Sequence, residues 1–253
     1  MSVAPSPAGA AAGTSRLFAL VPCAGVGARA ARDLPKQYSV LAGQAMVEHT
    51  LNALARVPRL ATTLVVLSPD DAWFERACPQ FGGWVARCGG ATRALSVAHG
   101  LAELARRGAG EHDWVLVHDA ARCLIRPEWV NRLIDACVGD PVGGLLAVPV
   151  ADTLKFEAQG RAARTVPRAG HWAAQTPQMF RLGLLRAALA AAGSAVTDEA
   201  SAVEALGHAP LLVPGSASNF KVTWPDELEL AARLLRPVSE PDRIGTESLE
   251  AAP

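Results

Sequence analysis

The sequence predicts an α/β fold with a mostly parallel, twisted sheet, and three observations support this prediction. The chain has 253 residues, half of them hydrophobic, which is enough for one large buried core. From Arg16 onward, short apolar segments of strand type alternate with longer segments of helical period. The strand-type segments are apolar throughout, as in strands that are buried on both faces of a parallel sheet.

The predicted strands, in chain order, cover residues 17–22, 62–67, 114–117, 144–148, 211–214 and 220–222. Helices are predicted where apolar residues recur every three to four positions and so line one helical face. Met46, Val47, Leu51 and Leu54 form the first such face. Two more faces span residues 97–104 and 130–137, and further helices are expected over 182–192 and 228–235.

Residues 151–168 break this pattern because they are polar and contain a glycine turn. With Lys155, Glu157 and Arg164 in it, the segment is too polar for a buried strand or helix. It is predicted to be a projecting β-hairpin whose turn lies near Gln159 and Gly160. An isolated hairpin is only marginally stable, so we expect this arm, about residues 151–170, to pack on a partner subunit.

The two ends of the chain lack any structural period. Residues 1–15 are mostly Ala, Pro, Gly and Ser, without the basic and apolar regions of a signal peptide. Residues 237–253 are polar. We therefore expect a disordered leader over 1–15, one folded domain over 16–236 and a disordered tail over 237–253.

Composition argues against several classes of function. The chain has 24 Lys and Arg residues and 24 Asp and Glu residues, so a formal net charge of zero gives no long-range attraction to nucleic acid or anionic membranes. No apolar run approaches the roughly 18 residues of a membrane helix, and we expect a cytoplasmic protein. The five cysteines form no C-x-x-C pair and no histidine lies at metal-ligand spacing from them, so no structural zinc site is predicted.

The first segment that indicates chemistry is the glycine-rich turn Pro22-Cys23-Ala24-Gly25-Val26-Gly27-Ala28-Arg29 after the first predicted strand. Glycines there let backbone N–H groups approach a phosphate, and Arg29 and Lys36 supply countercharge. A dinucleotide-binding dehydrogenase motif begins in the same way. The looser form of that motif allows Ala30 at its third glycine position. However, the second strand ends in the Pro-interrupted turn Leu67-Ser68-Pro69-Asp70 and the P-K-Q-Y loop is too polar for a tight βαβ unit, so this alternative is disfavoured.

Two further turns point to the same edge of the sheet. Gly89 and Gly90 precede a predicted helix whose free N–H groups can face an anion or a base edge, although an ordinary helix start has the same pattern. Asp119 follows the strand 114–117, and open α/β sheets bind ligands at the carboxyl ends of their strands. Asp119 therefore either meets a ribose or a magnesium ion, or serves as a helix cap or surface ion pair.

Lys221 lies in the apolar segment 220–222, which is unusual because burying an unpaired ammonium is costly. We therefore expect it to have an anionic partner, from the protein or from a ligand. Three other polar segments accompany it: Asp152-Thr153 at the base of the hairpin, Gln175-Thr176-Pro177-Gln178 before a helix, and Thr197-Asp198-Glu199, which also fits a helix N-terminus.

Taken together, these segments resemble the 2-C-methyl-D-erythritol 4-phosphate cytidylyltransferases of the non-mevalonate isoprenoid pathway. The motifs P-x-A-G-x-G-x-R, P-K-Q-Y, V-H-D-A-A-R, D-T-x-K, Q-T-P-Q, T-D-E-A-S and N-x-K-V-T-x-P-D-x-L occur in the family's order between about residues 17 and 235. The resemblance implies a Rossmann-like nucleotidyltransferase domain. It also implies in-line attack of the acceptor phosphate on the α-phosphorus of CTP, giving 4-diphosphocytidyl-2-C-methyl-D-erythritol and pyrophosphate.

The same resemblance assigns roles by motif. The catalytic cations would be Arg29, Lys36 and Lys221. The nucleotide would be bound by Pro22, Cys23, Ala24, Gly25, Gly27, Gly90, Ala91, Ser96, Asp119 and Ala120. The acceptor would be bound by Asp119, Arg122, Thr153, Thr176, Thr197 and Arg168, the last of these from a neighbouring subunit, with Arg161 or Arg164 as alternatives. Cations suit this reaction because the two phosphates repel each other and the pentacoordinate phosphorus gathers negative charge.

The resemblance also implies Mg²⁺ or another divalent cation, held mainly by phosphate oxygens, so that no protein metal site is required. The partners would be CTP, a sugar-alcohol phosphate and a second copy of the chain, joined through the hairpin arm, without nucleic acid or membrane. Three alternatives remain: a ribitol 5-phosphate cytidylyltransferase with overlapping motifs, a nicotinamide dehydrogenase, and a non-catalytic nucleotide-binding regulator.

Overall fold

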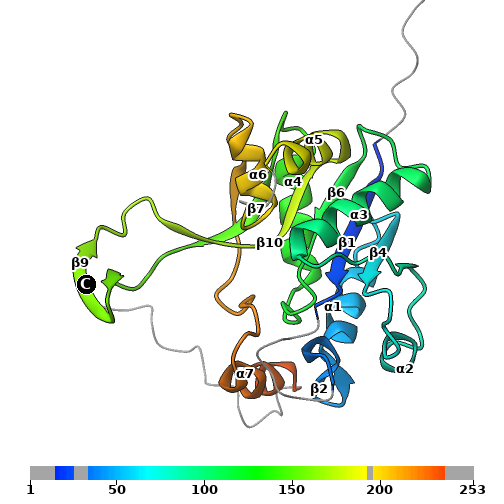
Figure 1. Cartoon of the computed structure of the whole chain (residues 1–253), viewed down its shortest axis with the longest axis horizontal. Helices are drawn as coiled ribbons and strands as arrows, with labels where there is room; N and C mark the ends of the chain where they lie inside the picture. The colour runs from blue at the N-terminus through cyan, green and yellow to red at the C-terminus, as the bar shows by residue number, and fades with distance from the viewer. Residues whose placement is uncertain (1–14, 26–33, 193–195, 237–253) are drawn as a thin grey trace, which may run out of the picture.

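A seven-stranded sheet runs through the molecule and helices cover both of its faces (Figure 1). The structure is a computed structural model and describes residues 15–25, 34–192 and 196–236. The strands lie in the order β11-β7-β10-β6-β1-β4-β5. Their bounds are Leu211–Pro214, Gly143–Pro149, Trp172–Arg181, Trp114–Val117, Leu17–Cys23, Thr62–Leu67 and Trp84–Ala86, in that order. All neighbouring pairs are parallel except those of β10, which runs antiparallel to β6 and β7. This confirms the predicted α/β class with a mostly parallel sheet.

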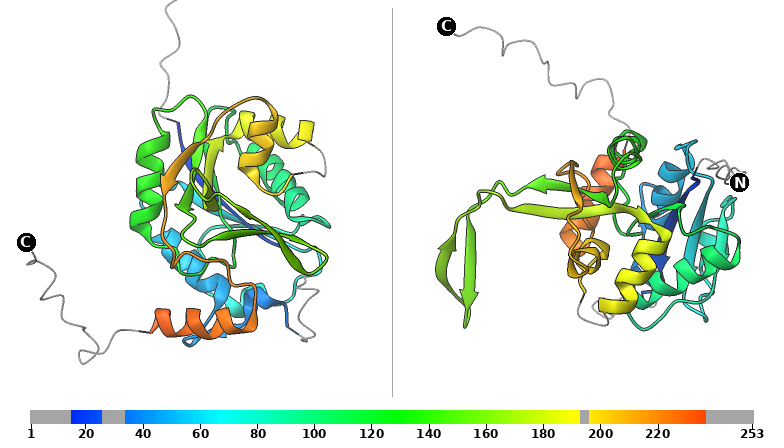
Figure 2. Two further views of the ribbon diagram at one scale, coloured as in Figure 1. Left: turned by 90° about the vertical axis from the view of Figure 1, so that its left-hand side faces the viewer. Right: turned by 90° about the horizontal axis from the view of Figure 1, so that it is seen from above.

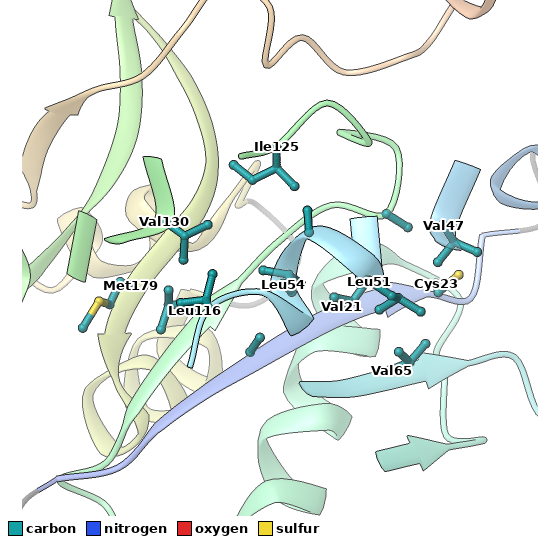
Figure 3. Packing of buried hydrophobic residues seen from close by; sticks show 14 of the residues in the cluster. Val21, Cys23, Val47, Leu51, Leu54, Val65, Leu116, Ile125, Val130 and Met179 are labelled. Carbon is teal, nitrogen blue, oxygen red and sulfur yellow. The ribbon is translucent and has the colours of Figure 1, made fainter. Parts of the chain in front are cut away.

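Side chains along each central strand alternate between two apolar layers. In β1, Phe18 and Leu20 face the layer formed with α3 (Arg93–Arg106), α5 (Leu182–Ala192) and α6 (Glu199–Ala205). Ala19 and Val21 face the other layer, formed with α1 (Met46–Ala55) and α4 (Pro127–Cys137), part of which is drawn in Figure 3. Because both faces are covered, the central strands are apolar throughout, as the sequence indicated.

Smaller elements complete the chain. The segment after β1 contains the 3-10 helix η1 (Lys36–Tyr38) and the short pair β2 (Val40–Leu41) and β3 (Gln44–Ala45). Helix α2 (Phe74–Ala77) follows β4, and α7 (Pro225–Leu235) is the last described helix. Among the described residues, no helix is both long enough and apolar enough to cross a bilayer.

The predicted hairpin is present and extends away from the sheet (Figure 2). Strands β8 (Leu154–Ala158) and β9 (Arg161–Val166) pair antiparallel around Gln159 and Gly160, whose φ angles of 55° and 75° are in the left-handed region. The arm continues the β7–β10 pair, which is joined as far out as Trp172 opposite Pro149. Nearly all side chains of the hairpin are exposed.

Two expectations about the strands are wrong. Residues 220–222 do not form a strand, because this segment is held by side-chain bonds and by one backbone bond from Val222 N–H to the Ala121 carbonyl. Strands β5 and β10 were not predicted, and residues 175–178, expected to precede a helix, lie inside β10, which leads into α5. Residues 1–14, most of the predicted leader, and the predicted tail 237–253 lie outside the described residues.

Candidate active site

A pocket of about 510 Å³ opens where β1, β4 and β6 end. Parallel strands bring their carboxyl ends to the same edge, so segments far apart in sequence meet there. The lining comes from the turn after β1, from η1, from the loop before α3, from the turn after β6 and from the segment before α7. Its members are Pro22, Cys23, Ala24, Gly25, Lys36, Gln37, Ser68, Gly89, Gly90, Ala91, Thr92, Arg93, Ser96, Asp119, Ala120, Ala121 and Lys221.

Glycine allows the loop before α3 to approach the turn after β1. The Gly89 N–H donates to the Leu67 carbonyl at 2.8 Å, and a Cβ atom on Gly89 would lie 2.2 Å from the Cβ of Ala24. The next residue, Gly90, donates its N–H to Ser96 Oγ at 3.1 Å. The two loops therefore form one continuous backbone wall, which only glycine permits at Gly89.

Both predicted lysines reach the pocket, and each is held by the protein. The Lys36 ammonium donates to the carbonyl of Val222, which places it beside the segment that carries Lys221. Lys221 Nζ lies 3.1 Å from Asp119 Oδ2, so the expected anionic partner is present. Its side chain is 45% exposed, more than the predicted strand location implied. The chain contains three lysines, and two of them line this pocket.

Asp119 is the carboxylate around which these cations gather. It is almost fully buried, and its Oδ1 accepts a hydrogen bond from Arg93 Nε at 2.7 Å. Burial opposes its ionisation, but Arg93 and Lys221 together hold the pKa of Asp119 well below its usual range. Asp119 is therefore a carboxylate at neutral pH with a cation on each of its oxygens.

Two buried side chains, Thr176 and His118, form a hydrogen-bonded relay that holds the backbone of Asp119. The Thr176 hydroxyl accepts the Asp119 N–H at 3.0 Å and lies 3.0 Å from His118 Nδ1, to which it donates. On the other side of the ring, Nε2 is 3.2 Å from the Arg122 carbonyl. Burial lowers the pKa of His118 to about 4, so the ring is neutral at pH 7 and donates from Nε2 alone.

The remaining acceptor residues predicted from the motifs are placed differently. Arg122 donates to the Asn219 carbonyl at 2.7 Å and its Nε is 3.8 Å from Asp119 Oδ2, so it lies behind the pocket wall. Thr197 lines an adjoining cavity of about 540 Å³ that shares Arg93 with the pocket. Thr153 and Arg168 belong to the arm and do not line the pocket of their own chain. Gly27 and Arg29 lie outside the described residues.

Sequence reasoning missed two charged residues of this site. Arg93 donates to Asp119 and also to both oxygens of Glu199, at 2.6 and 3.0 Å. A signal was present, because an arginine in the first turn of a helix opposes the helix dipole and needs nearby carboxylates. Glu199 belongs to the segment that was identified as a helix N-terminus, and it is indeed the first residue of α6.

The described lining of this pocket offers few side-chain ligands for a divalent cation. Among the described residues, no group of three or more His, Cys, Asp and Glu side chains could hold a metal. Asp119 is the carboxylate in the described lining, and both its oxygens already face cations. The described donor set therefore offers no protein cage for a divalent cation.

A Rossmann-like sheet with glycine turns and cations gathered at the carboxyl ends of its strands defines a nucleotide-binding α/β protein. A family model described as IspD, 2-C-methyl-D-erythritol 4-phosphate cytidylyltransferase, matches residues 17–237. The chain belongs to this family and is a nucleotidyltransferase of the non-mevalonate isoprenoid pathway. The family uses a divalent cation.

Individual relatives agree with the family model. A 2-C-methyl-D-erythritol 4-phosphate cytidylyltransferase of Laribacter hongkongensis is 56% identical, and the match covers 87% of this chain and 96% of that protein. A bifunctional IspD/IspF enzyme of Albidiferax ferrireducens is 58% identical over 93% of this chain, which spans 56% of that longer protein.

Solved structures support the same assignment. A crystal structure of a 4-diphosphocytidyl-2C-methyl-D-erythritol synthase has a TM-score of 0.78 and 44% identity, covering 88% of this chain and 99% of that one. The crystal structure of the Thermus thermophilus enzyme has a TM-score of 0.72 and 34% identity, covering 87% and 98%. These matches exclude the dehydrogenase and regulator alternatives and favour methylerythritol phosphate over ribitol 5-phosphate.

Proposed function

We propose that the pocket at the carboxyl ends of β1, β4 and β6 is where this cytidylyltransferase binds CTP and 2-C-methyl-D-erythritol 4-phosphate. The observation that carries the proposal is that Lys36 and Lys221 line the same pocket, beside a backbone wall that contains glycines. Two lysines separated by most of the chain lie where a triphosphate and a second phosphate must approach each other.

The nucleotide occupies the side of the pocket formed by the two glycine loops. Backbone groups of Ala24, Gly90 and Ala91 meet the cytosine edge, and Ser96, already bonded to Gly90, fixes the loop that presents them. A wall of backbone groups selects a base by its pattern of donors and acceptors, because peptide groups cannot swing away as side chains do. Lys36 then faces the triphosphate, and the motif assigns Arg29, which lies outside the described residues, to the same phosphates.

The acceptor occupies the side of Asp119 and Lys221. Lys221 contacts both the acceptor phosphate and the α-phosphate, and Asp119 accepts from an acceptor hydroxyl while holding Lys221 in place. An acceptor phosphate oxygen attacks the α-phosphorus, forming one P–O bond as the bond to the β-phosphate oxygen breaks. Pyrophosphate leaves with that bonding pair. Catalysis is mainly positioning and charge stabilisation, since no covalent enzyme intermediate is needed.

A divalent cation supplies charge neutralisation on the triphosphate oxygens when it is bound. The protein residues do the rest: the glycine wall orients the base, the lysines bring the two phosphates together, and the Thr176–His118 relay holds the backbone N–H of Asp119. Because His118 is neutral at pH 7, the relay adds no charge to a pocket that must accept anions.

The arm completes the site in a two-fold dimer. Its side chains are exposed, and Thr153 and Arg168 lie away from the pocket of their own chain, so they would act in the pocket of a second copy. In this chain the Arg168 guanidinium donates to the Ala151 carbonyl at the base of the arm.

The test is pyrophosphate release from CTP with Mg²⁺ and either 2-C-methyl-D-erythritol 4-phosphate or ribitol 5-phosphate, with ATP, GTP and UTP as controls. We expect turnover with CTP and the branched acceptor. Lysine acetylation followed by mass spectrometry then locates the site: CTP should protect Lys36 and Lys221 but leave Lys155 of the arm unchanged. Activity without this protection would show that the reaction occurs elsewhere on the molecule.

A further inference from the structure

Arg93 sits at a position that is unfavourable for a cation. It is the first residue of α3, where the positive end of the helix dipole repels its guanidinium. Two buried carboxylates compensate: Asp119 accepts from Nε at 2.7 Å, and Glu199 accepts from Nη1 and Nη2 at 2.6 and 3.0 Å. The Glu199 side chain is 1% exposed, so this carboxylate is shielded from water, whereas the Arg93 side chain is 27% exposed.

Glu199 decides which part of Arg93 meets Asp119. Its two oxygens each accept one hydrogen from a terminal nitrogen, which orients the guanidinium so that Nε faces the pocket side and donates to Oδ1. Oδ2 of Asp119 is thereby left to Lys221, 3.1 Å away. Without Glu199, the terminal nitrogens of Arg93 are able to turn to Asp119 and compete with Lys221 for the same carboxylate.

Rigid elements fix the position of Glu199. Asp198 caps α6 in a capping box with Ser201. Gln178 in β10 joins that cap to the sheet, donating to Asp198 Oδ2 at 2.8 Å and accepting from the Ala200 N–H at 2.7 Å. In the sheet register Gln178 lies opposite Val117, and Val117 precedes Asp119 by two residues. The two carboxylates that flank Arg93 are therefore anchored to neighbouring strands.

We propose that Glu199 is a positioning residue for cytidylyl transfer, which by holding both terminal nitrogens of Arg93 reserves one oxygen of Asp119 for Lys221. The proposal rests on the proposed function, in which Lys221 contacts the two phosphates that react. It adds a residue that touches neither substrate and acts through Arg93.

The test compares E199Q with the double variant R93Q/E199Q. E199Q removes one negative charge and leaves Arg93, Arg122 and Lys221 to share Asp119. We expect kcat to fall about tenfold and KM for the acceptor to rise, with KM for CTP changed less than about twofold. In the double variant the amide nitrogen of the introduced glutamine takes the place of the Arg93 Nε and donates to Asp119 without the competing charge. We therefore expect most of the lost turnover to return, to within about threefold of the unaltered enzyme.

The control is E103Q, which makes the same change in a glutamate that pairs with Arg106 and Arg107 at the far end of α3. We expect its kinetic constants to match those of the unaltered chain. Acetylation of Lys221 in the absence of substrates gives a readout independent of turnover. It should be faster in E199Q than in the unaltered chain, and slow again in R93Q/E199Q, with Lys155 as internal reference.

A purely structural role predicts otherwise: E199Q would melt earlier with both KM values and the acetylation of Lys221 unchanged, and the double variant would be no better than E199Q. Either result would overturn the proposal. If E199Q does not fold, the double variant alone decides, because a loss of turnover beyond about tenfold, or rapid acetylation of its Lys221, contradicts the proposal. Failure of the proposed function is seen separately, as absence of activity in the unaltered enzyme or full activity of K221M.

Discussion

Replacing Lys221 by methionine tests the assignment of this residue to the transition state. In the free protein Lys221 is 45% exposed and pairs with Asp119, whose side chain is 9% exposed. When the lysine is removed, the buried carboxylate keeps its hydrogen bond from Arg93 on Oδ1. Folding should therefore survive the change. A cation that stabilises the charge of the pentacoordinate phosphorus in a closed site is worth about 3 kcal/mol, so kcat/KM should fall by about two orders of magnitude.

Arg186 provides a matched control. Its side chain is also 45% exposed and pairs with Glu111 at 2.6 Å, but it lies on α5 and does not line the pocket. Since both partners of this pair are exposed, we expect Arg186→Met to lower stability by about 0.2–1 kcal/mol and to leave turnover unchanged. Both variants are compared by steady-state pyrophosphate release and by urea unfolding. The reasoning is refuted if Lys221→Met retains more than about a third of the activity, or if the two variants lose activity equally.

Three further predictions follow from the same geometry. Gly89→Ala should raise KM for CTP at least about tenfold in steady-state assays, because its Cβ would lie 2.2 Å from Ala24 Cβ, whereas Gly139→Ala, with open space around it, should not. Between pH 7 and 5 the free energy of unfolding should fall by about 2 kcal/mol more in the unaltered chain than in His118→Asn, by urea titration. The folded-state pKa of about 4 lies below the unfolded value of about 6.5, so the unfolded chain gains the proton first as pH falls. Mixing Lys221→Ala and Arg168→Ala subunits should restore activity to about a quarter of the sites if the arm is shared, and no recovery would indicate self-contained sites.

The strands that could be predicted are those formed by short runs of mostly apolar residues. Strands β4, β6 and β11 have the predicted bounds because they are apolar between turn residues. β10 was missed because its first three residues are exposed at the base of the arm and its middle carries Gln175, Thr176 and Gln178, whose polar side chains hide the strand pattern. The segment 220–222 was mistaken for a strand for the opposite reason, since its apolar residues pack against α7 and not in the sheet.

Site residues could be predicted where a sequence motif follows the end of a strand. They could not be predicted where two residues far apart in the sequence contact each other. Asp119, Lys36 and Lys221 were found from sequence, and all three line the pocket. The link from Arg93 to Glu199 joins the starts of two helices 106 positions apart, and no local period reports such a pair. Thr176 was expected at the acceptor, yet its hydroxyl bonds to Asp119 and His118, which a sequence motif cannot distinguish from ligand binding.

β10 connects the two functions proposed for the molecule. Its outer half pairs with β7 to form the base of the arm, and its inner half pairs with β6 and supplies the residues that hold Asp119 and cap α6. The register shifts between Ala174 and Gln178, so the segment carrying Thr176 departs from regular pairing and turns its polar groups to the site. In the proposed dimer, a contact of the partner with the arm would act on the strand that carries Thr176, the residue that holds Asp119. Dimer contact and the geometry around Lys221 should consequently change together, because one strand carries both.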